Sequence, residues 1–511
     1  MRSRHIHTLL SLASALLLAL PFLFPVLFPL SWVSLVPLLW LIDRVPLRQA
    51  FLFGWLAGAV TNLVGFYWLN YTIGVFGGFP HGLIELIFLG FIAYGGLPVA
   101  LFALITRFHG TGPLGLFPAL AWVAIEFWFP QLFPWHLANS QAYFLPLIQW
   151  ADLVGPYGTS FLLVWINTVL YKVAETSLRP QAVQKEPKPP MRELASVGAL
   201  LVCVLVYGAV KLGTVAREIQ RAPSLRVAAV QGNIDIRTKG DFTYLESNLE
   251  TYKKLTAGIE RADLIIWPES AVEAWMPEDL RRLPPEIMPV LPDGTSFFLF
   301  GVRSVRESLD VPTPTVFNSA YLVDRQGEVS GRYHKQVLLA FGEFIPVVSI
   351  LSKLPGMPPI GKGFTPGEGP RTLDLSPTVK LATLICYEDL MPWVSRRFVG
   401  AAQANLLINL TNDAWFGRTV APWQHVNLAR WRAIETRRAL VRATNAGLTS
   451  VISPTGEILS TIPPFSTGVL TAEVPLLHGE TPYVRFGDWF SWIVTASLLC
   501  FLVVRQFAAL F

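Results

Sequence analysis

Long apolar segments fill most of the first 215 residues, and they restrict the possible folds more than any other feature. Only 15% of the chain is charged, whereas soluble globular proteins carry about a quarter charged residues. Apolar helices of this length match the roughly 30 Å hydrocarbon core of a bilayer. The sequence therefore predicts a polytopic α-helical membrane domain with about eight spans. We expect these spans at 7–25, 27–42, 51–73, 82–106, 112–129, 158–175, 194–214 and 487–510.

The distribution of Lys and Arg predicts how these spans are oriented. Basic residues flank alternate ends of the spans, at Arg2, Arg4, Arg44, Arg48, Arg107, Lys172 and Arg192. The loops between them, near 25, 74–81 and 130–157, contain no Lys or Arg. Because cytoplasmic loops are enriched in these residues, we expect both chain ends in the cytoplasm and the residues after the seventh span outside it. The net charge of +5 lies largely in such loops and does not indicate nucleic-acid binding.

Residues 221–480 have the composition of an ordinary globular domain and are numerous enough to bury a core. Apolar β-branched runs alternate there with helical patterns, which predicts an α/β sandwich. Helices are expected at Thr243–Arg261 and Trp423–Arg442. We therefore expect a membrane domain at 1–215, an extracytoplasmic α/β domain at 221–480 and a C-terminal transmembrane helix at 486–511. The Gly-, Pro- and Phe-rich segment 340–370 is expected to be a lid or binding loop.

Three residues that end predicted strands carry the strongest chemical signal. Glu269, Lys335 and Cys386 each follow such a strand, and the carboxyl ends of strands in α/β folds are where sites assemble. Cys386 is the only one of three cysteines outside the apolar segments. A free thiol is a poor nucleophile until a base or cation promotes the thiolate. A desolvated carboxylate can move its proton, and a lysine with a backbone N–H can stabilise an oxyanion. Together these groups indicate acyl transfer through a thioester.

Each of these residues also has a structural reading. A lone Glu is usually solvated, a lone Lys is usually a surface charge, and a lone Cys often packs as a small hydrophobe. His334 and His425 are not favoured as general bases, because neither has Ser or Cys in its local sequence. The sequence shows no metal-ligand spacing and no phosphate-binding glycine loop.

Several motifs extend the pattern over nearly the whole chain. The resemblance rests on Val230–Ile234, Trp267–Ser270, Tyr333–Lys335, Phe341–Pro346, Cys386–Glu388, Asn412–Gly417, Pro422–His425, Arg442–Gly447, Gly65–Trp68 and Ala151–Gly158. On these motifs, residues 221–480 resemble the nitrilase, or carbon-nitrogen hydrolase, superfamily, with its αββα sandwich. The whole chain resembles the bacterial apolipoprotein N-acyltransferase family. The chain departs from the family at His334, at Val337–Ala340 and at Gly240, where a tryptophan is usual.

The resemblance implies a catalytic triad without a cofactor or metal. Glu269 would be the proton acceptor, Lys335 the oxyanion stabiliser and Cys386 the nucleophile. The supporting residues would be Glu343, Tyr387 and Glu388, with Glu343 orienting Lys335 or gating and Glu388 orienting Lys335 or capping a helix. Phe341, Trp415 and Phe416 are candidates for acyl-chain contact, although core packing explains them equally well.

The resemblance also implies the partners and the location. The acyl donor would be a membrane phospholipid, typically phosphatidylethanolamine, and the acceptor a diacylglyceryl-apolipoprotein. We expect a monomer in the bacterial cytoplasmic membrane, with the catalytic domain periplasmic and no nucleic-acid partner. A membrane-tethered amidase or nitrilase would share the same thioester chemistry, and a non-enzymatic lipid-binding protein is a third reading. The membrane domain argues against the amidase or nitrilase. The intact Glu269, Lys335 and Cys386 argue against the non-enzymatic lipid-binding protein.

Overall fold

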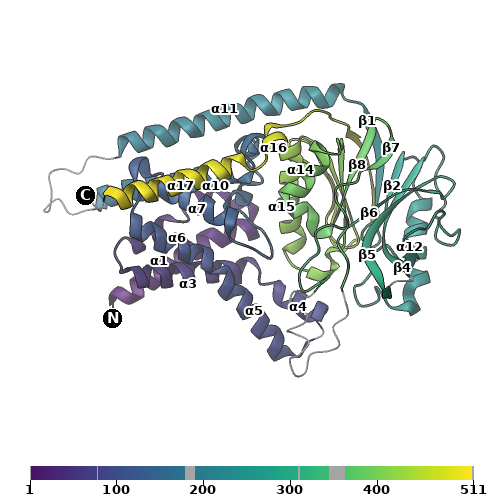
Figure 1. The fold of residues 1–511 in the computed structure, drawn as a ribbon, viewed down its shortest axis with the longest axis horizontal. Coiled ribbons are helices and arrows are strands. Elements are labelled where there is room, and N and C mark those ends of the chain that lie inside the picture. Colours follow the sequence, from purple (N-terminus) through teal and green to yellow (C-terminus); the bar gives the residue numbers. More distant parts are fainter. Residues whose placement is uncertain (1, 78, 179–189, 309–310, 345–362, 509–511) are drawn as a thin grey trace. The chain divides into compact units, whose positions relative to one another are not determined.

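The computed structural model describes residues 2–77, 79–178, 190–308, 311–344 and 363–508. The chain divides into two units (Figure 1). The membrane unit comprises Met1–Gly74, Gly78–Thr214 and Phe486–Phe511, and the sandwich unit comprises Val75–Gly77 and Val215–Arg485. The centre of the predicted lid, 345–362, and most of the loop between the predicted spans 158–175 and 194–214 lie outside the described residues.

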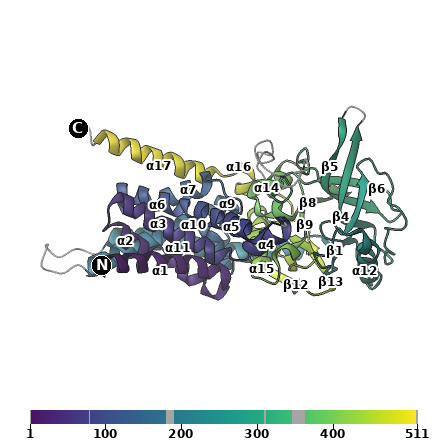
Figure 2. The ribbon, with the colours of Figure 1, turned by 90° about the horizontal axis from the view of Figure 1, so that it is seen from below.

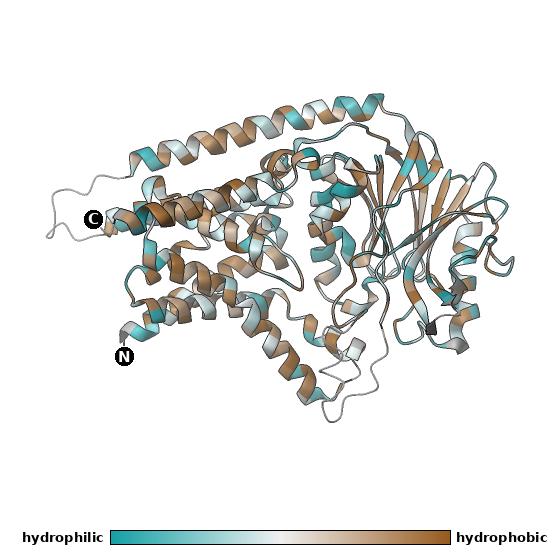
Figure 3. Ribbon diagram, in the orientation of Figure 1, coloured by the Kyte–Doolittle hydropathy of each residue, from teal (hydrophilic) through white to brown (hydrophobic). Residues whose placement is uncertain are grey.

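All the regular secondary structure among the described residues of the membrane unit is helical. The helices are α1 (Arg2–Leu23), η1 (Pro25–Trp32), α2 (Val36–Ile42), α3 (Leu47–Gly65), α4 (Leu69–Gly77), α5 (His81–Gly95), α6 (Leu97–His109), η2 (Pro113–Gly115), α7 (Phe117–Trp128), η3 (Leu137–Gln141), α8 (Leu145–Ile148), α9 (Ala151–Val154), α10 (Pro156–Leu178), α11 (Met191–Arg221) and α17 (Trp489–Ala508). Figure 3 shows apolar residues along most of these helices.

The predicted polytopic helical domain is confirmed, with a small difference in the number of spans. Among the described residues, six helical segments are long and apolar enough to cross a membrane, or seven if the bent pair α3 and α4 counts as one span. Seven of the eight predicted segments correspond to these. The remaining one, 112–129, yields the 12-residue helix α7, which is shorter than the roughly 20 residues that a span needs. Left-handed backbone at Gly112, Leu114 and Gly115 delays the start of that helix.

Small residues let the helices of the membrane unit approach closely. Gly54 and Gly58 of α3 face α6, and a Cβ on Gly54 would lie 2.5 Å from the Cβ of Ala103. Such small-residue contacts replace the hydrophobic driving force that is missing between helices in lipid.

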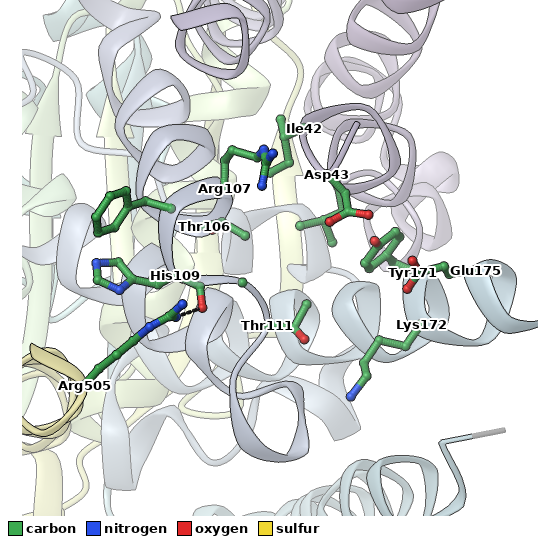
Figure 4. Close-up of a pocket in the computed structure, with 13 residues that line it drawn as sticks. Ile42, Asp43, Thr106, Arg107, His109, Thr111, Tyr171, Lys172, Glu175 and Arg505 are labelled. Atoms are coloured by element: carbon green, nitrogen blue, oxygen red, sulfur yellow. Dashed lines mark hydrogen bonds between the residues drawn. The ribbon is translucent and has the colours of Figure 1, made fainter. Parts of the chain in front are cut away.

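A polar cavity of about 330 Å³ lies in the membrane unit at the ends of α2, α6, α10 and α17. Figure 4 shows Asp43, Arg107, His109, Lys172 and Arg505 around it. The helix ends that carry these residues are predicted to lie on the same side of the membrane. Their convergence on one cavity shows that they do share one side of this unit.

Two sheets form the centre of the sandwich unit. The first has the order β13-β1-β2-β4-β5-β6, with β3 paired to β4, and the second has the order β12-β11-β10-β9-β8-β7. Their strands are β1 (Ser224–Gln231), β2 (Leu264–Ile266), β3 (Val272–Pro277), β4 (Phe297–Ser308), β5 (Val311–Asp324), β6 (Val329–His334), β7 (Leu373–Ser376), β8 (Val379–Ile385), β9 (Leu406–Thr411), β10 (Leu440–Thr444), β11 (Thr449–Ile452), β12 (Ile458–Ile462) and β13 (Gly468–Pro475). β4 and β5 pair along almost their whole length as a long hairpin (Figure 2).

Helices cover the outer face of each sheet. Side chains alternate along β1, so that Val227 and Ala229 join the core between the sheets while Ala228 and Val230 face α12 (Leu245–Ala257). The second sheet is covered by α14 (Pro392–Gly400) and α15 (Ala421–Thr436) (Figure 1). The predicted αββα sandwich is therefore confirmed.

The predicted helix Trp423–Arg442 is too long at its C-terminal end. Helix α15 ends at Thr436, and Arg437 adopts the left-handed conformation with φ +52°. The following residues form β10, which pairs parallel with β9 and antiparallel with β11. The sequence 437–442 suits a helix by local propensity, but burial between two strands decides its structure.

A buried glutamine joins the two sheets. Gln231 of β1 is fully buried, and its Oε1 accepts from the hydroxyls of Thr444 (2.9 Å) and Thr449 (2.5 Å). Its Nε2 donates to the carbonyls of Pro463 and Ser466, both at 2.8 Å. All the hydrogen-bonding capacity of this amide is therefore used inside the core.

We expect Gln231→Leu to destabilise the sandwich unit by about 2–4 kcal/mol, because it leaves several buried polar groups without partners. A denaturant titration of the full chain in detergent measures the effect. The matched control is Gln326→Leu, in an exposed turn, which should behave like the wild type. An unchanged denaturation midpoint for Gln231→Leu would contradict this role.

Candidate active site

The three predicted residues line one cavity of about 280 Å³ in the sandwich unit. Glu269 follows β2, Lys335 follows β6 and Cys386 follows β8. The side chains of Glu269 and Lys335 are buried, and Lys335 Nζ lies 3.8 Å from Glu269 Oε1. The carboxyl ends of strands from both sheets thus supply an acid, a cation and a thiol to one cavity.

Glu343 and Asn318 complete the environment of Lys335. Lys335 Nζ lies 2.7 Å from Glu343 Oε2. Asn318 Nδ2, on β5, donates to both Glu269 and Glu343 at 2.8 Å. The amide thereby separates two carboxylates that would otherwise repel each other. Asn318 was missed by the sequence analysis. It is one of several polar residues in its strand, so its sequence context carries no signal.

Burial and the neighbouring charges shift the pKa values of the groups in this cavity, in some cases in opposite directions. Burial lowers the pKa of Lys335, but the negative charges of Glu343, Cys386 and Glu269 outweigh it and raise that pKa. The pKa of Glu269 is raised by burial and by the charge of Glu343, against the opposing effect of Lys335. The pKa of Cys386 is raised, by burial first and then by Glu269. Burial therefore favours the neutral thiol over the thiolate, and a carboxyl group suited to accept its proton lies in the same cavity.

Cys386 is held in an unusual backbone conformation. It begins η5 (Cys386–Leu390) directly after β8, with φ +51°. A non-glycine residue in this region costs of order 1–3 kcal/mol. Asn409 Nδ2 donates to the Cys386 carbonyl at 3.0 Å and helps to maintain the corner. The sequence predicted a strand-to-helix corner here but gave no sign of the positive φ.

Glu388 ties the segment after Lys335 to the segment before Cys386. Its carboxylate accepts from the Tyr333 hydroxyl and from the backbone N–H groups of Gln336, Val337 and Ile385. Burial raises the pKa of Glu388 to about 7. Of the two roles considered from the sequence, this geometry favours positioning of Lys335 over simple helix capping, because two of the donors directly follow Lys335.

The apolar candidates occupy different places. Trp415 lines the cavity, together with Phe364, which the sequence analysis did not single out. Phe416 lies with its ring 6.3 Å from that of His425. Phe341 is 64% exposed, and Tyr387 is buried directly after Cys386.

His425 belongs to a buried network of charges. Its Nδ1 lies 2.8 Å from Asp413 and its Nε2 lies 2.8 Å from Asp389. Arg442 contacts both carboxylates. Because both imidazole nitrogens face carboxylates, His425 has no free nitrogen with which to activate a thiol. The network instead fixes the chain after Cys386 to α15 and β10.

The cavity is also lined by two cations, Lys239 and Arg303, that were not predicted from the sequence. Lys239 lies in the segment after β1, and Arg303 lies on β4. Asn445 anchors the Lys239 segment, because its side chain donates to the Ile234 carbonyl and accepts from the Ile234 N–H. Part of the Arg442–Gly447 motif therefore serves to position one wall of the site.

Comparisons with known proteins agree with this geometry. The carbon-nitrogen hydrolase family model matches residues 226–481, and the apolipoprotein N-acyltransferase N-terminal domain model matches residues 14–169. The apolipoprotein N-acyltransferase of Geobacter metallireducens is 34% identical over 500 residues, covering 96% of this chain and 93% of that protein. The apolipoprotein N-acyltransferase of Pseudomonas paraeruginosa is 31% identical, covering 90% and 88%.

The αββα sandwich, with acid, amine and thiol at its strand ends, defines a carbon-nitrogen hydrolase domain, here attached to a membrane unit. The chain belongs to the apolipoprotein N-acyltransferase family.

Gly301 allows Glu269 to reach its position. A Cβ at Gly301 would lie 2.6 Å from the Cα of Glu269 and from neighbouring backbone atoms. We expect Gly301→Ala to lower N-acyltransferase activity by roughly 10²-fold, because small displacements of reacting groups are costly. Gly258→Ala, where the nearest atom is 3.6 Å away, is the control. Full activity of Gly301→Ala in a transferase assay would contradict this packing argument.

Proposed function

We propose that the protein transfers a fatty acyl chain from a membrane phospholipid to the α-amine of the N-terminal diacylglyceryl-cysteine of apolipoproteins. The transfer proceeds through a thioester on Cys386. The observation that carries the proposal is the buried cavity shared by Glu269, Lys335 and Cys386, in a chain whose relatives are named apolipoprotein N-acyltransferase.

In the first half-reaction, Glu269 accepts the thiol proton of Cys386 and the thiolate attacks the ester carbonyl of the phospholipid. A C–S bond forms, and the carbonyl electrons move to the oxygen, where Lys335 and the Tyr387 N–H stabilise the oxyanion. The intermediate collapses, the C–O bond breaks, and the departing lysophospholipid oxygen takes the proton back from Glu269.

In the second half-reaction, the amine of the apolipoprotein attacks the thioester carbonyl. A C–N bond forms and the C–S bond breaks, while Glu269 accepts a proton from the amine and returns it to the Cys386 sulfur. The enzyme leaves this step in its starting protonation state, and two substrates use one site in turn. Glu343 and Asn318 hold Lys335 in place throughout.

The same chemistry would serve a membrane-tethered amidase or nitrilase. The membrane unit favours the transferase, because substrates confined to a bilayer require an enzyme that is anchored there, whereas small soluble amides do not. The full-length similarity to the N-acyltransferases, including the N-terminal domain, supports the same choice.

The proposed location is the bacterial cytoplasmic membrane, with the chain ends in the cytoplasm and the sandwich unit in the periplasm. It is supported by the excess of Lys and Arg near one set of helix ends and by the convergence of these ends on one cavity (Figure 4). The proposed partners are a phospholipid donor, phosphatidylethanolamine by family resemblance, and a diacylglyceryl-apolipoprotein acceptor. We propose a monomer.

We expect purified protein incubated with phospholipid to carry a fatty-acyl mass on Cys386, released by hydroxylamine and absent from Cys386→Ala. Intact-protein mass spectrometry measures it. An adduct that persists in Cys386→Ala would remove Cys386 from the nucleophile role.

Glu269→Gln should lower adduct formation by roughly 10²–10⁴-fold, the usual contribution of a general base. Normal acylation in that variant would remove Glu269 from the base role.

The orientation predicts which introduced thiols react from outside the cell. In a Cys386→Ala background, Lys254→Cys on exposed α12 should react in intact cells with a membrane-impermeant maleimide. Arg48→Cys, exposed at the start of α3, should react only after permeabilisation. Labelling in the reverse order would refute the proposed orientation.

A further inference from the structure

The cavity of Cys386 contains two cations that the acyl-transfer steps do not use. Lys239 Nζ donates to the Ser270 carbonyl at 2.8 Å, and Arg303 Nη2 donates to the Glu273 carbonyl at 2.9 Å. Both partners are neutral backbone oxygens. Among the residues that the structure describes, neither cation forms an ion pair with a carboxylate, and the buried Arg303 Nε has no acceptor.

The nearest acid is already engaged. Glu273 is buried, and its carboxylate accepts from the Gly240 N–H and, at 2.9 Å, from Asn248 Nδ2. Burial and, to a smaller extent, the neighbouring charge of Arg303 lower the pKa of Lys239 to about 8, against the opposing charges of Glu273 and Glu269. Two like charges thus share a partly desolvated wall of the cavity, and a bound anion would stabilise both.

Among the described residues that line the cavity, Glu273 is the acid beside this wall, and the other two carboxylates serve different groups. Glu343 pairs with Lys335, and Glu269 must alternate between acid and base. The cavity therefore places an acyl-accepting thiol and an anion-binding wall in one space. A glycerophospholipid carries its ester carbonyl and its phosphate on one short glycerol unit, which matches this combination.

Gly240 makes this wall accessible. It adopts φ +89°, and a Cβ placed there would meet no atom within 4 Å. The space beside Lys239 is therefore open.

We propose that Lys239 and Arg303 bind the phosphate of the phospholipid acyl donor and so select phosphate-bearing esters. This inference rests on the proposed function and identifies the part of the donor that the site recognises. The two residues are positioning residues for the donor, and they take no part in the making or breaking of bonds.

The experiment compares two acyl donors that differ in the phosphate. Dihexanoyl phosphatidylethanolamine and p-nitrophenyl hexanoate deliver the same acyl chain to Cys386, but only the first carries a phosphate. Single-turnover acylation is followed by mass spectrometry in the full chain. We expect Lys239→Gln and Arg303→Gln each to lower the ratio of acylation efficiencies, phospholipid over nitrophenyl ester, by roughly 10–100-fold. This is the loss expected for one charge-assisted hydrogen bond.

Three controls separate recognition from folding. Arg306→Gln, three residues further along β4, and Lys254→Gln on α12 remove comparable exposed charges and should leave the ratio at its wild-type value. Lys239→Arg keeps the positive charge and should recover most of the ratio. Thermal unfolding of every variant is measured in parallel.

The outcomes are distinct. A ratio that stays at the wild-type value in Lys239→Gln and Arg303→Gln overturns the phosphate site, whether both donors slow equally or neither does. A wild-type enzyme that forms no adduct with phosphatidylethanolamine overturns the proposed function itself, because the donor class would then be wrong.

Discussion

The buried ammonium of Lys335 is the interaction on which the rest of the site depends. It lies between Glu343 and Glu269, and the amide of Asn318 bridges the two carboxylates from the next strand. An unpaired buried charge would cost several kcal/mol, so these groups can only be buried together. The αββα sandwich makes this possible by bringing β2, β5, β6 and β8 to one edge. The geometry of Cys386, Glu269 and Lys335 then follows from the strands that these residues end.

Sequence patterns located the main features because each has a local signature. Apolar length identifies membrane helices, and the apolar runs before Glu269 and Cys386 identify two of the strand ends. Features that depend on contacts distant in sequence have no such signature. Asn318 is one polar residue in a strand, Lys239 lies in an unremarkable loop, and β10 has a sequence that also suits a helix. The positive φ of Cys386 likewise results from the surrounding packing rather than from local preference.

The membrane unit and the sandwich unit are stabilised by different interactions. In the membrane unit, glycines bring α3 and α6 together, because lipid offers little gain from burying apolar side chains. In the sandwich unit, apolar burial between sheets drives folding, and Gln231 enters the core with its amide fully bonded. In the buried network of Asp389, Asp413, His425 and Arg442, each charge faces an opposite one.

The left-handed backbone at Cys386 has a consequence for how such a site persists over time. A glycine at this position would relax the backbone. Loss of Lys335 or Glu269 would instead leave buried charges of the cluster without their partner, at a cost in stability. Substitution of the thiol therefore favours stability over chemistry, whereas substitution of its charged neighbours does not. A lineage that no longer used the thiol would be expected to lose it early, whereas the surrounding sandwich could remain intact for much longer.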